Sequence, residues 1–287
     1  MAKKSDAPWI GAHVGRNGSL ASTIDAAEAI GATAIQIFGS SPRVWRTVMP
    51  KADDVAAFKE RRGKSSVRAV FLHAAYLVNL ASASADLYAF STQSLIDHLK
   101  IADIIGAEGL IFHLGSCKGG DRDTAFEHEI AAMKRVLESV PGKTKLIMEN
   151  TAGGGDKIGA SIEDVARIYK AMKSDRVKIC YDTAHGFEAG LVSEYTSDSV
   201  KKLFDAWEKA VGMDAFAALH ANDSKTLTGS HHDQHENIGE GHIGIKGFEA
   251  LCADARLHAL PWLLETPGFD GNGPDKKNVD TLRSCFA

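Results

Sequence analysis

The sequence predicts a single (β/α)₈ barrel with its active site at the carboxyl ends of the strands. Eight short apolar runs alternate with eight segments of helical pattern. The runs are almost continuously apolar, which is typical of strands buried on both faces of a parallel sheet. A doubly wound open sheet would use similar units, but eight regular units with no break in composition favour a closed barrel.

Each predicted strand is followed by a segment with helix signals. The first segment begins at Ser19, a suitable N-cap, and ends at Gly31. Ser161 is a suitable cap for another helix, which has acidic residues in its first turn. The predicted strands are 9–14, 34–39, 67–74, 109–115, 145–151, 177–185, 216–223 and 261–267. The predicted helices are 19–32, 51–63, 91–107, 123–140, 161–175, 197–212, 245–257 and 278–286.

Composition is that of an ordinary globular protein. Of the 287 residues, 44% are apolar and 24% are charged, so we expect residues 9–287 to form one catalytic barrel domain after a flexible tail, 1–8. The net charge of −4 argues against a protein that coats nucleic acid by bulk electrostatics. No apolar run approaches the roughly 18 residues of a membrane span, and no secretory signal is visible. With four widely spaced cysteines interpreted as free thiols, we expect a cytoplasmic protein without a membrane partner.

Nine potential metal ligands lie at or after the ends of the predicted strands. One such histidine is commonly a hydrogen-bonded core residue, but nine residues converging on one rim are hard to explain by packing. Imidazole and carboxylate without thiolate suit Zn²⁺, Mn²⁺ or Fe²⁺, and one zinc takes only about three or four protein ligands. Two or three ions would fit, and three Zn²⁺ would leave a positive excess that suits an anionic phosphate. The set is His73, His113, Glu149, Asp182, His185, His220, Asp233, His235 and Glu265.

Several motifs together resemble the endonuclease IV family of apurinic/apyrimidinic (AP) endonucleases. They extend over nearly the whole chain and include H-x-x-Y-L-V-N-L, E-N-T-A-G, Y-D-T-x-H-G-F, H-x-N-D-S-K, D-x-H-x-x-I-G-E-G-x-I-G and L-E-T-P. The resemblance implies a barrel with three zinc ions that acts as a monomer on double-stranded DNA. It implies hydrolysis 5′ to an abasic site, which leaves a 3′-hydroxyl, and trimming of blocked 3′ ends in base excision repair.

The resemblance also implies roles for individual residues. All nine ligand positions carry the expected residue, and Glu149 would bridge metals and orient or deprotonate the attacking water. Arg43, Tyr76 and Leu77 stand where the family fills the gap left by a flipped nucleotide, as planar or apolar wedges do.

Four further polar residues are expected near the site. Asn222 and Lys225, in H-x-N-D-S-K, are expected to contact DNA phosphate. Asp223 is expected to support the ligands from a second layer, and His13, at the end of the first strand, is expected to do the same or to contact the substrate.

Two departures from the family pattern concern DNA affinity. Leu114 replaces a usual proline in H-P-G-S, and Gln234 replaces a frequent arginine between Asp233 and His235. His231 and His232 are interpreted as loop residues, and their roles stay open.

Two other functions compete with the nuclease. A sugar isomerase or epimerase on a similar barrel would need one or two metals, and a catalytically silent DNA-binding relative would need none. The isomerase could use Glu149, Asp182, His220 and Glu265, but it would leave the other ligands without a role.

Overall fold

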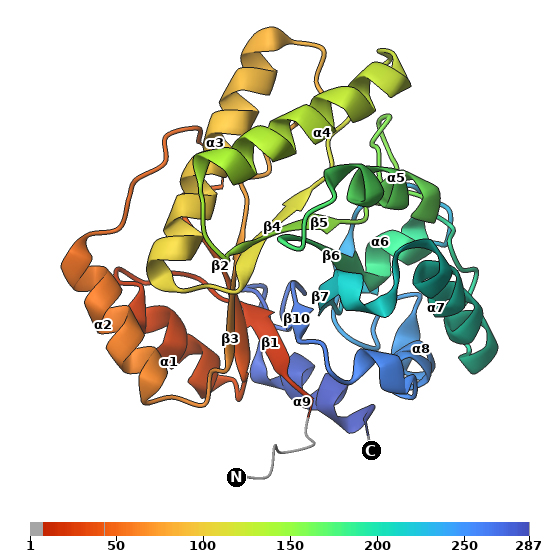
Figure 1. The fold of residues 1–287 in the computed structure, drawn as a ribbon. Helices are drawn as coiled ribbons and strands as arrows, with labels where there is room; N and C mark the ends of the chain where they lie inside the picture. The colour runs from red at the N-terminus through yellow and green to blue at the C-terminus, as the bar shows by residue number, and fades with distance from the viewer. Residues whose placement is uncertain (1–7, 43, 287) are drawn as a thin grey trace.

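Eight parallel strands close into a barrel with helices outside it, which confirms the predicted fold class (Figure 1). The structure is a computed structural model that describes residues 8–42 and 44–286. Around the barrel the strands follow the order β1–β10–β7–β6–β5–β4–β3–β2. They are β1 (Ile10–His13), β2 (Ala34–Phe38), β3 (Ala69–His73), β4 (Gly109–His113), β5 (Lys145–Glu149), β6 (Val177–Asp182), β7 (Phe216–His220) and β10 (Trp262–Leu264).

The helices surround the strands, and α3 and α4 pack side by side (Figure 1). The helix predicted to begin at residue 91 begins earlier, because the Ser84 hydroxyl accepts the amide of Leu87 and caps it there. The helices are α1 (Ala21–Ala29), α2 (Ala52–Gly63), α3 (Ala85–Ile105), α4 (Arg122–Ser139), α5 (Ile162–Met172), α6 (Thr183–Glu188), α7 (Ser197–Val211), α8 (Gly244–Cys252) and α9 (Lys276–Ser284).

Two elements at the carboxyl end of the barrel differ from the prediction. The strand expected over 177–185 ends at Asp182, whose carboxylate accepts the amide of His185 at 2.8 Å and so caps the short helix α6. After β7, a small antiparallel hairpin forms where only a loop was expected. It consists of β8 (Asp223–Ser224) and β9 (His235–Glu236).

A small apolar cluster fills the inside of the barrel. Its members come from seven strands around the closed sheet, so they can meet only within it. Space there is limited: a Cβ on Gly11 would lie 2.6 Å from Leu263 Cδ2 and 2.7 Å from the Ala34 carbonyl oxygen. The cluster contains Ala34, Ala69, Phe71, Ile111, Ile147, Cys180, Ala218 and Leu263.

A polar layer lies directly above this cluster. Side chains two residues apart on a strand point to the same side of the sheet. Gly11 on β1 and the cluster members on the other seven strands point into the barrel. The residue two positions further along each strand therefore also points inward, one layer closer to the carboxyl ends. From Ala69 this step gives the cluster member Phe71 itself, and from the others it gives His13, Gln36, His73, His113, Glu149, Asp182, His220 and Glu265.

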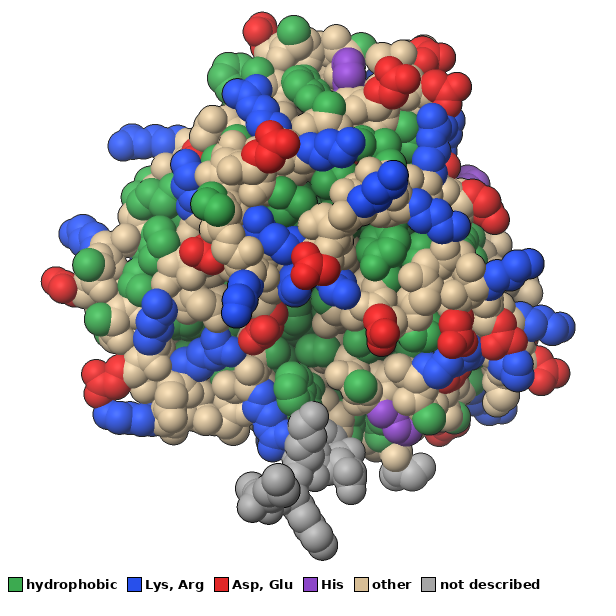
Figure 2. All heavy atoms as spheres, in the orientation of Figure 1, with side chains coloured by type: hydrophobic (Ala, Val, Ile, Leu, Met, Phe, Trp, Pro, Cys, Tyr) green, Lys and Arg blue, Asp and Glu red, His purple; other side chains and the backbone are tan. Residues whose placement is uncertain are grey.

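Charge on the outer surface is mixed. On the face in Figure 2, Lys and Arg side chains are interspersed with Asp and Glu side chains. Attraction for a polyanion must therefore come from the local arrangement of charge rather than from the net charge of −4. Within residues 8–42 and 44–286, no helix is long and apolar enough to cross a membrane.

One buried carboxyl group lies in α4. Glu129 is fully buried, and neither carboxylate oxygen makes a hydrogen bond of normal geometry. Burial raises the pKa of Glu129 to about 8, and attraction to the backbone of Gly115 only partly offsets this effect. The folded protein therefore holds a proton on Glu129 at pH values where the unfolded chain has released it.

We predict that this group makes folding less favourable as pH rises. The pKa of Glu129 is higher in the folded protein than in the unfolded chain. The contribution of Glu129 to the free energy of unfolding is therefore fully present below the unfolded pKa and is lost as the pH rises to about 8. Relative to Glu129→Gln, the wild type should lose up to roughly 3 kcal/mol of unfolding free energy between about pH 5.5 and pH 8.5. Urea titrations of chelator-treated protein measure this difference. Glu127→Gln, on the exposed side of the same helix, is the control and should match the wild type at both pH values.

Candidate metal centre

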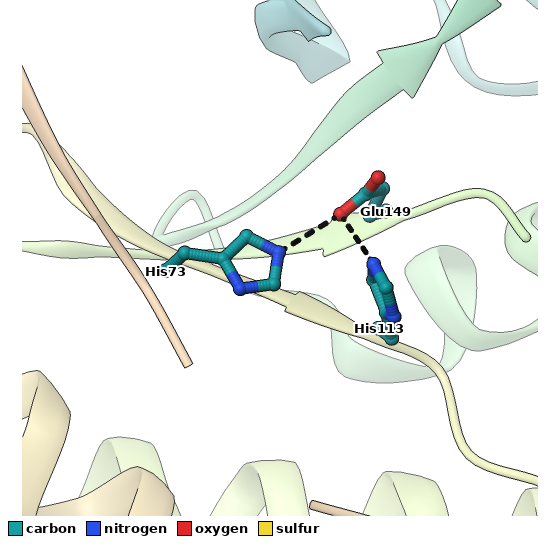
Figure 3. Close-up of side chains that lie close together, drawn as sticks. All are labelled: His73, His113 and Glu149. Carbon is teal, nitrogen blue, oxygen red and sulfur yellow. Dashed lines mark hydrogen bonds and ion pairs between the residues drawn. The ribbon is translucent and has the colours of Figure 1, made fainter. Parts of the chain in front are cut away.

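The nine predicted ligands meet at the carboxyl end of the barrel, with Glu149 in the middle. Figure 3 shows His73 from β3 and His113 from β4 pointing at the carboxylate of Glu149 on β5. Both Nε2 atoms lie 3.2 Å from Glu149 Oε2. Ligand atoms of these three residues lie within 4.8 Å of one another, so a single cation could bind all three.

The other oxygen of Glu149 belongs to a second group. Glu149 Oε1 lies 3.0 Å from His220 Nδ1, which is also 3.3 Å from Glu265 Oε2 and 3.7 Å from Asp182 Oδ2. Ligand atoms of these four residues also lie within 4.8 Å of one another. Because its two oxygens face different groups, Glu149 could bridge two cations.

A third group forms around Asp233. Its Oδ1 lies 3.1 Å from His185 Nε2 and 3.9 Å from His235 Nε2. Both imidazole nitrogens are buried, and neither makes a hydrogen bond. Buried polar atoms normally have partners, so these two fit a bound metal ion.

The opposite ring nitrogens fix how two of these histidines face the centre. His73 Nδ1–H donates to the Ala74 carbonyl at 2.8 Å, and His185 Nδ1–H donates to the Asn150 carbonyl at 2.9 Å. A carbonyl only accepts, so each Nε2 keeps its lone pair free for a metal.

Gln36 lies next to three polar side chains of the site and was not predicted from the sequence. Its Oε1 accepts from His220 Nε2–H at 2.8 Å, which leaves His220 Nδ1 as the ligand atom. Its amide donates to Glu265 Oε1 at 2.5 Å, and its Nε2 lies 2.9 Å from His13 Nδ1. The available signal was a single amide side chain in the apolar run A-I-Q-I-F-G. His13 thus lies in the layer that supports Glu265.

The central carboxylates are held ionised. Burial alone would raise their pKa values, but His220 and His113 hold the pKa of Glu149 well below its usual range. Burial likewise opposes ionisation of Glu265, yet His220 and the hydrogen bond from His13 lower its pKa. Metal ligation requires the deprotonated forms.

Comparison with known proteins agrees with this geometry. The family described as "Xylose isomerase-like TIM barrel" matches residues 24–285. A "Probable endonuclease 4" from Aquifex aeolicus is 34% identical over 277 residues, which cover 96% of this chain and 97% of the relative. One from Petrotoga mobilis is 35% identical over 84% of this chain and 85% of its own length. The chain belongs to the endonuclease IV family of AP endonucleases.

Solved structures separate the family from the wider fold. Endonuclease IV from Thermus thermophilus has a TM-score of 0.83 at 32% identity and covers 97% of this chain, while 98% of its own length is covered. A D-tagatose 3-epimerase-like protein has a TM-score of 0.72 at 18% identity, with 96% of each chain covered, and shows a shared fold alone. The protein is therefore an enzyme, a hydrolase of the AP endonuclease type.

A groove of about 840 Å³ leads to the candidate metal centre of this endonuclease IV family member. Tyr76 and Leu77 line it and are 61% and 37% exposed, so both are accessible to a large ligand. Lys118 and Lys157 also line it, and Lys157 Nζ lies 3.2 Å from Asp233 Oδ2. Arg43 lies outside the described residues.

The prediction that Asn222 contacts DNA is wrong, because this side chain is fully buried. Its amide donates to Asp182 Oδ2 at 2.7 Å, and its oxygen accepts the backbone amide of Glu265 at 2.7 Å. Asn222 therefore positions two candidate ligands.

Among the other residues singled out in the sequence, Leu114 lines the groove, and Lys225, Gln234, His231 and His232 do not. Lys225 and Gln234 are exposed, and Leu114 is buried against the turn at Gly159. His231 and His232 belong to none of the ligand groups among the described residues. The ring of His231 instead donates to the carbonyl of Ala152 at 3.0 Å.

Asp223 supports the centre indirectly, through the loop that follows β9. It is fully buried, and its two oxygens accept backbone amides across that loop. A Cβ on Gly241 would lie 2.5 Å from Asp223 Oδ1, so only glycine fits there. The amide donors belong to Gly239, Gly241, Ile243 and Gly244.

We predict that Asp223→Ala loosens this loop. Several buried amides would lose a charged acceptor, and each such hydrogen bond contributes about 1.5–3 kcal/mol. Hydrogen exchange at Gly239 and Ile243 should accelerate at least tenfold, and the unfolding free energy should fall by about 3 kcal/mol. Asp223→Asn keeps one acceptor oxygen and should show an intermediate effect. Unchanged exchange in Asp223→Ala would contradict this role.

Proposed function

We propose that the protein is a zinc-dependent AP endonuclease of base excision repair. It acts as a monomer on double-stranded DNA, hydrolyses the phosphodiester 5′ to an abasic site and leaves a 3′-hydroxyl. It also trims blocked 3′ ends. The observation that carries this proposal is the convergence of all nine ligand residues in overlapping groups, with five of the nine lining one groove.

Three zinc ions would be held by overlapping sets of residues. The first set is His73, His113 and Glu149. The second is Glu149, Asp182, His220 and Glu265. The third contains His185, His235 and Asp182, which the second set shares, together with Asp233.

Bound zinc ions supply Lewis acidity, which lowers the pKa of water and stabilises charge on the phosphate and the leaving oxygen. Glu149, with one oxygen toward each of the first two sets, orients the attacking water and accepts its proton on a carboxylate oxygen. Gln36 and Asn222 keep the surrounding ligands in place, so little reorganisation is needed during the reaction.

DNA binding is assigned to the groove walls. Tyr76 and Leu77 are exposed beside the centre and can fill the space left by an extruded abasic nucleotide. Arg43 is proposed for the same task. Positive charge for the phosphates of the DNA backbone comes from Lys118, Lys157 and Lys225. Gln234 is uncharged and adds none.

The isomerase alternative accounts for fewer of the residues. A ketose enzyme could use the second set alone, and it would leave His73 and His113, both 3.2 Å from Glu149, without a function. The third set would also be unused. A silent DNA-binding protein would have no reason to keep buried, ionised carboxylates at the bottom of its groove.

We predict zinc binding and lesion-specific nicking. Protein purified without added metal should contain about three zinc ions per chain by elemental analysis. It should nick a duplex 5′ to a single abasic site and spare the same duplex without the lesion. Glu149→Gln should reduce nicking by at least about a thousandfold, since proton transfer and metal bridging are both lost.

Several outcomes would contradict the proposal. One metal per chain, or conversion of free ketoses without nicking of DNA, would favour the isomerase. Full nicking by Glu149→Gln would remove the role given to Glu149.

We further predict that Lys157 contributes to DNA affinity. Lys157→Ala should weaken binding to an abasic duplex by roughly threefold to tenfold and reduce the salt-dependence slope by about one, because one phosphate contact is lost. Fluorescence anisotropy at several salt concentrations measures both quantities. Lys202→Ala, an exposed lysine on α7, is the matched control and should leave both unchanged. Equal slopes for the wild type and Lys157→Ala would rule out the contact.

A further inference from the structure

A tenth potential ligand lies beside the third set. Glu188 is the last residue of α6, three positions after His185, so both side chains lie on one face of that helix. Glu188 is fully buried. It offers an oxygen within 4.8 Å of ligand atoms of His185 and Asp233. Glu188 was not predicted from the sequence, because residues up to 185 were expected to form a strand, where side chains three residues apart point to opposite faces.

The two oxygens of Glu188 have different surroundings. Oε1 accepts from Ser224 Oγ at 2.7 Å, from the backbone amide of Gln234 at 3.2 Å and from Thr226 Oγ1 at 3.4 Å. Oε2 is equally buried but has no hydrogen-bond partner. No Lys or Arg among residues 8–42 and 44–286 forms an ion pair with Glu188, and Lys157 pairs with Asp233.

An unpartnered carboxylate oxygen in the interior is costly unless a cation faces it. The donors on Oε1 hold the carboxylate in place without satisfying Oε2. Two residues that suit a metal, His185 and Asp233, offer atoms within 4.8 Å of a Glu188 oxygen. His235 Nε2, which is unpaired like His185 Nε2, lies 3.9 Å from Asp233 Oδ1.

We infer that Glu188 binds the third metal ion through Oε2, as a fourth protein ligand beside His185, His235 and Asp233. This inference rests on the proposed function, because it requires the third ion. Structural zinc sites are closed by about four protein ligands, whereas catalytic sites keep a position open. The third ion would then have as many protein ligands as the second set provides, and the added carboxylate would lower the positive charge of the centre by one.

The test is zinc retention against a competing chelator. The wild type should keep its full zinc content at chelator concentrations that remove about one ion from Glu188→Gln, with affinity for that ion reduced at least tenfold. Glutamine still accepts from Ser224 and from the Gln234 amide, so the loop stays anchored. Ser224→Ala is the matched control: it removes a hydrogen bond to Oε1, leaves Oε2 intact and should keep zinc affinity within threefold of the wild type.

Stability of the metal-free protein separates ligation from packing. Metal-free Glu188→Gln should unfold at the same or higher urea concentration than the metal-free wild type, because a buried unpartnered charge is removed. If metal-free Glu188→Gln unfolds at a lower urea concentration than the metal-free wild type, Glu188→Asp replaces it in the chelator test. Aspartate keeps the negative charge, but its side chain is one methylene group too short to reach the third ion.

Two results would overturn the inference, and they can be told apart. Equal zinc retention by the wild type and both Glu188 variants would remove Glu188 from the metal shell and leave the proposed function standing. A wild type that binds no zinc and does not nick abasic DNA would remove the proposed function as well.

Discussion

The two-residue alternation of side chains along parallel strands determines where chemistry occurs in this protein. Inside a closed barrel, every second residue points inward, and the inward residues of neighbouring strands lie in layers. The lower layer is apolar and tightly filled, as the absence of room for a Cβ at Gly11 shows. The layer above it carries imidazoles and carboxylates from most of the strands. A shift of one residue in register would turn these groups into the apolar space between strands and helices.

This layer is stable only if its charges compensate one another. Glu149 is fully buried, and its two oxygens face imidazoles of two different groups. The histidines in turn are fixed through their second nitrogen by backbone carbonyls or by Gln36. A ligand set that is oriented in advance loses little entropy on binding a cation, and its carboxylates are already ionised.

The loops above the barrel complete the centre and belong to the same network. The β8–β9 hairpin brings Asp233 and His235 back over the strand ends, and Asp223 anchors the following loop through backbone amides. The loops also place two residues beyond the nine candidate ligands, Lys157 and Glu188, next to Asp233.

The sequence by itself determined the barrel and drew attention to the nine candidate ligands, because both depend on local patterns: apolar runs, helix caps, and polar residues at the ends of the runs or in the loop after the seventh strand. It could not identify Gln36 or Glu188, nor the buried position of Asn222. Those roles depend on contacts between residues far apart in the chain, such as Gln36 with His220 and Asn222 with Glu265. Tertiary structure also decided that the chain after Asp182 turns into a helix, because the Asp182 carboxylate caps it while facing the metal centre. Only closure of the barrel brings these groups within bonding distance, since ring closure fixes which side chains share a layer.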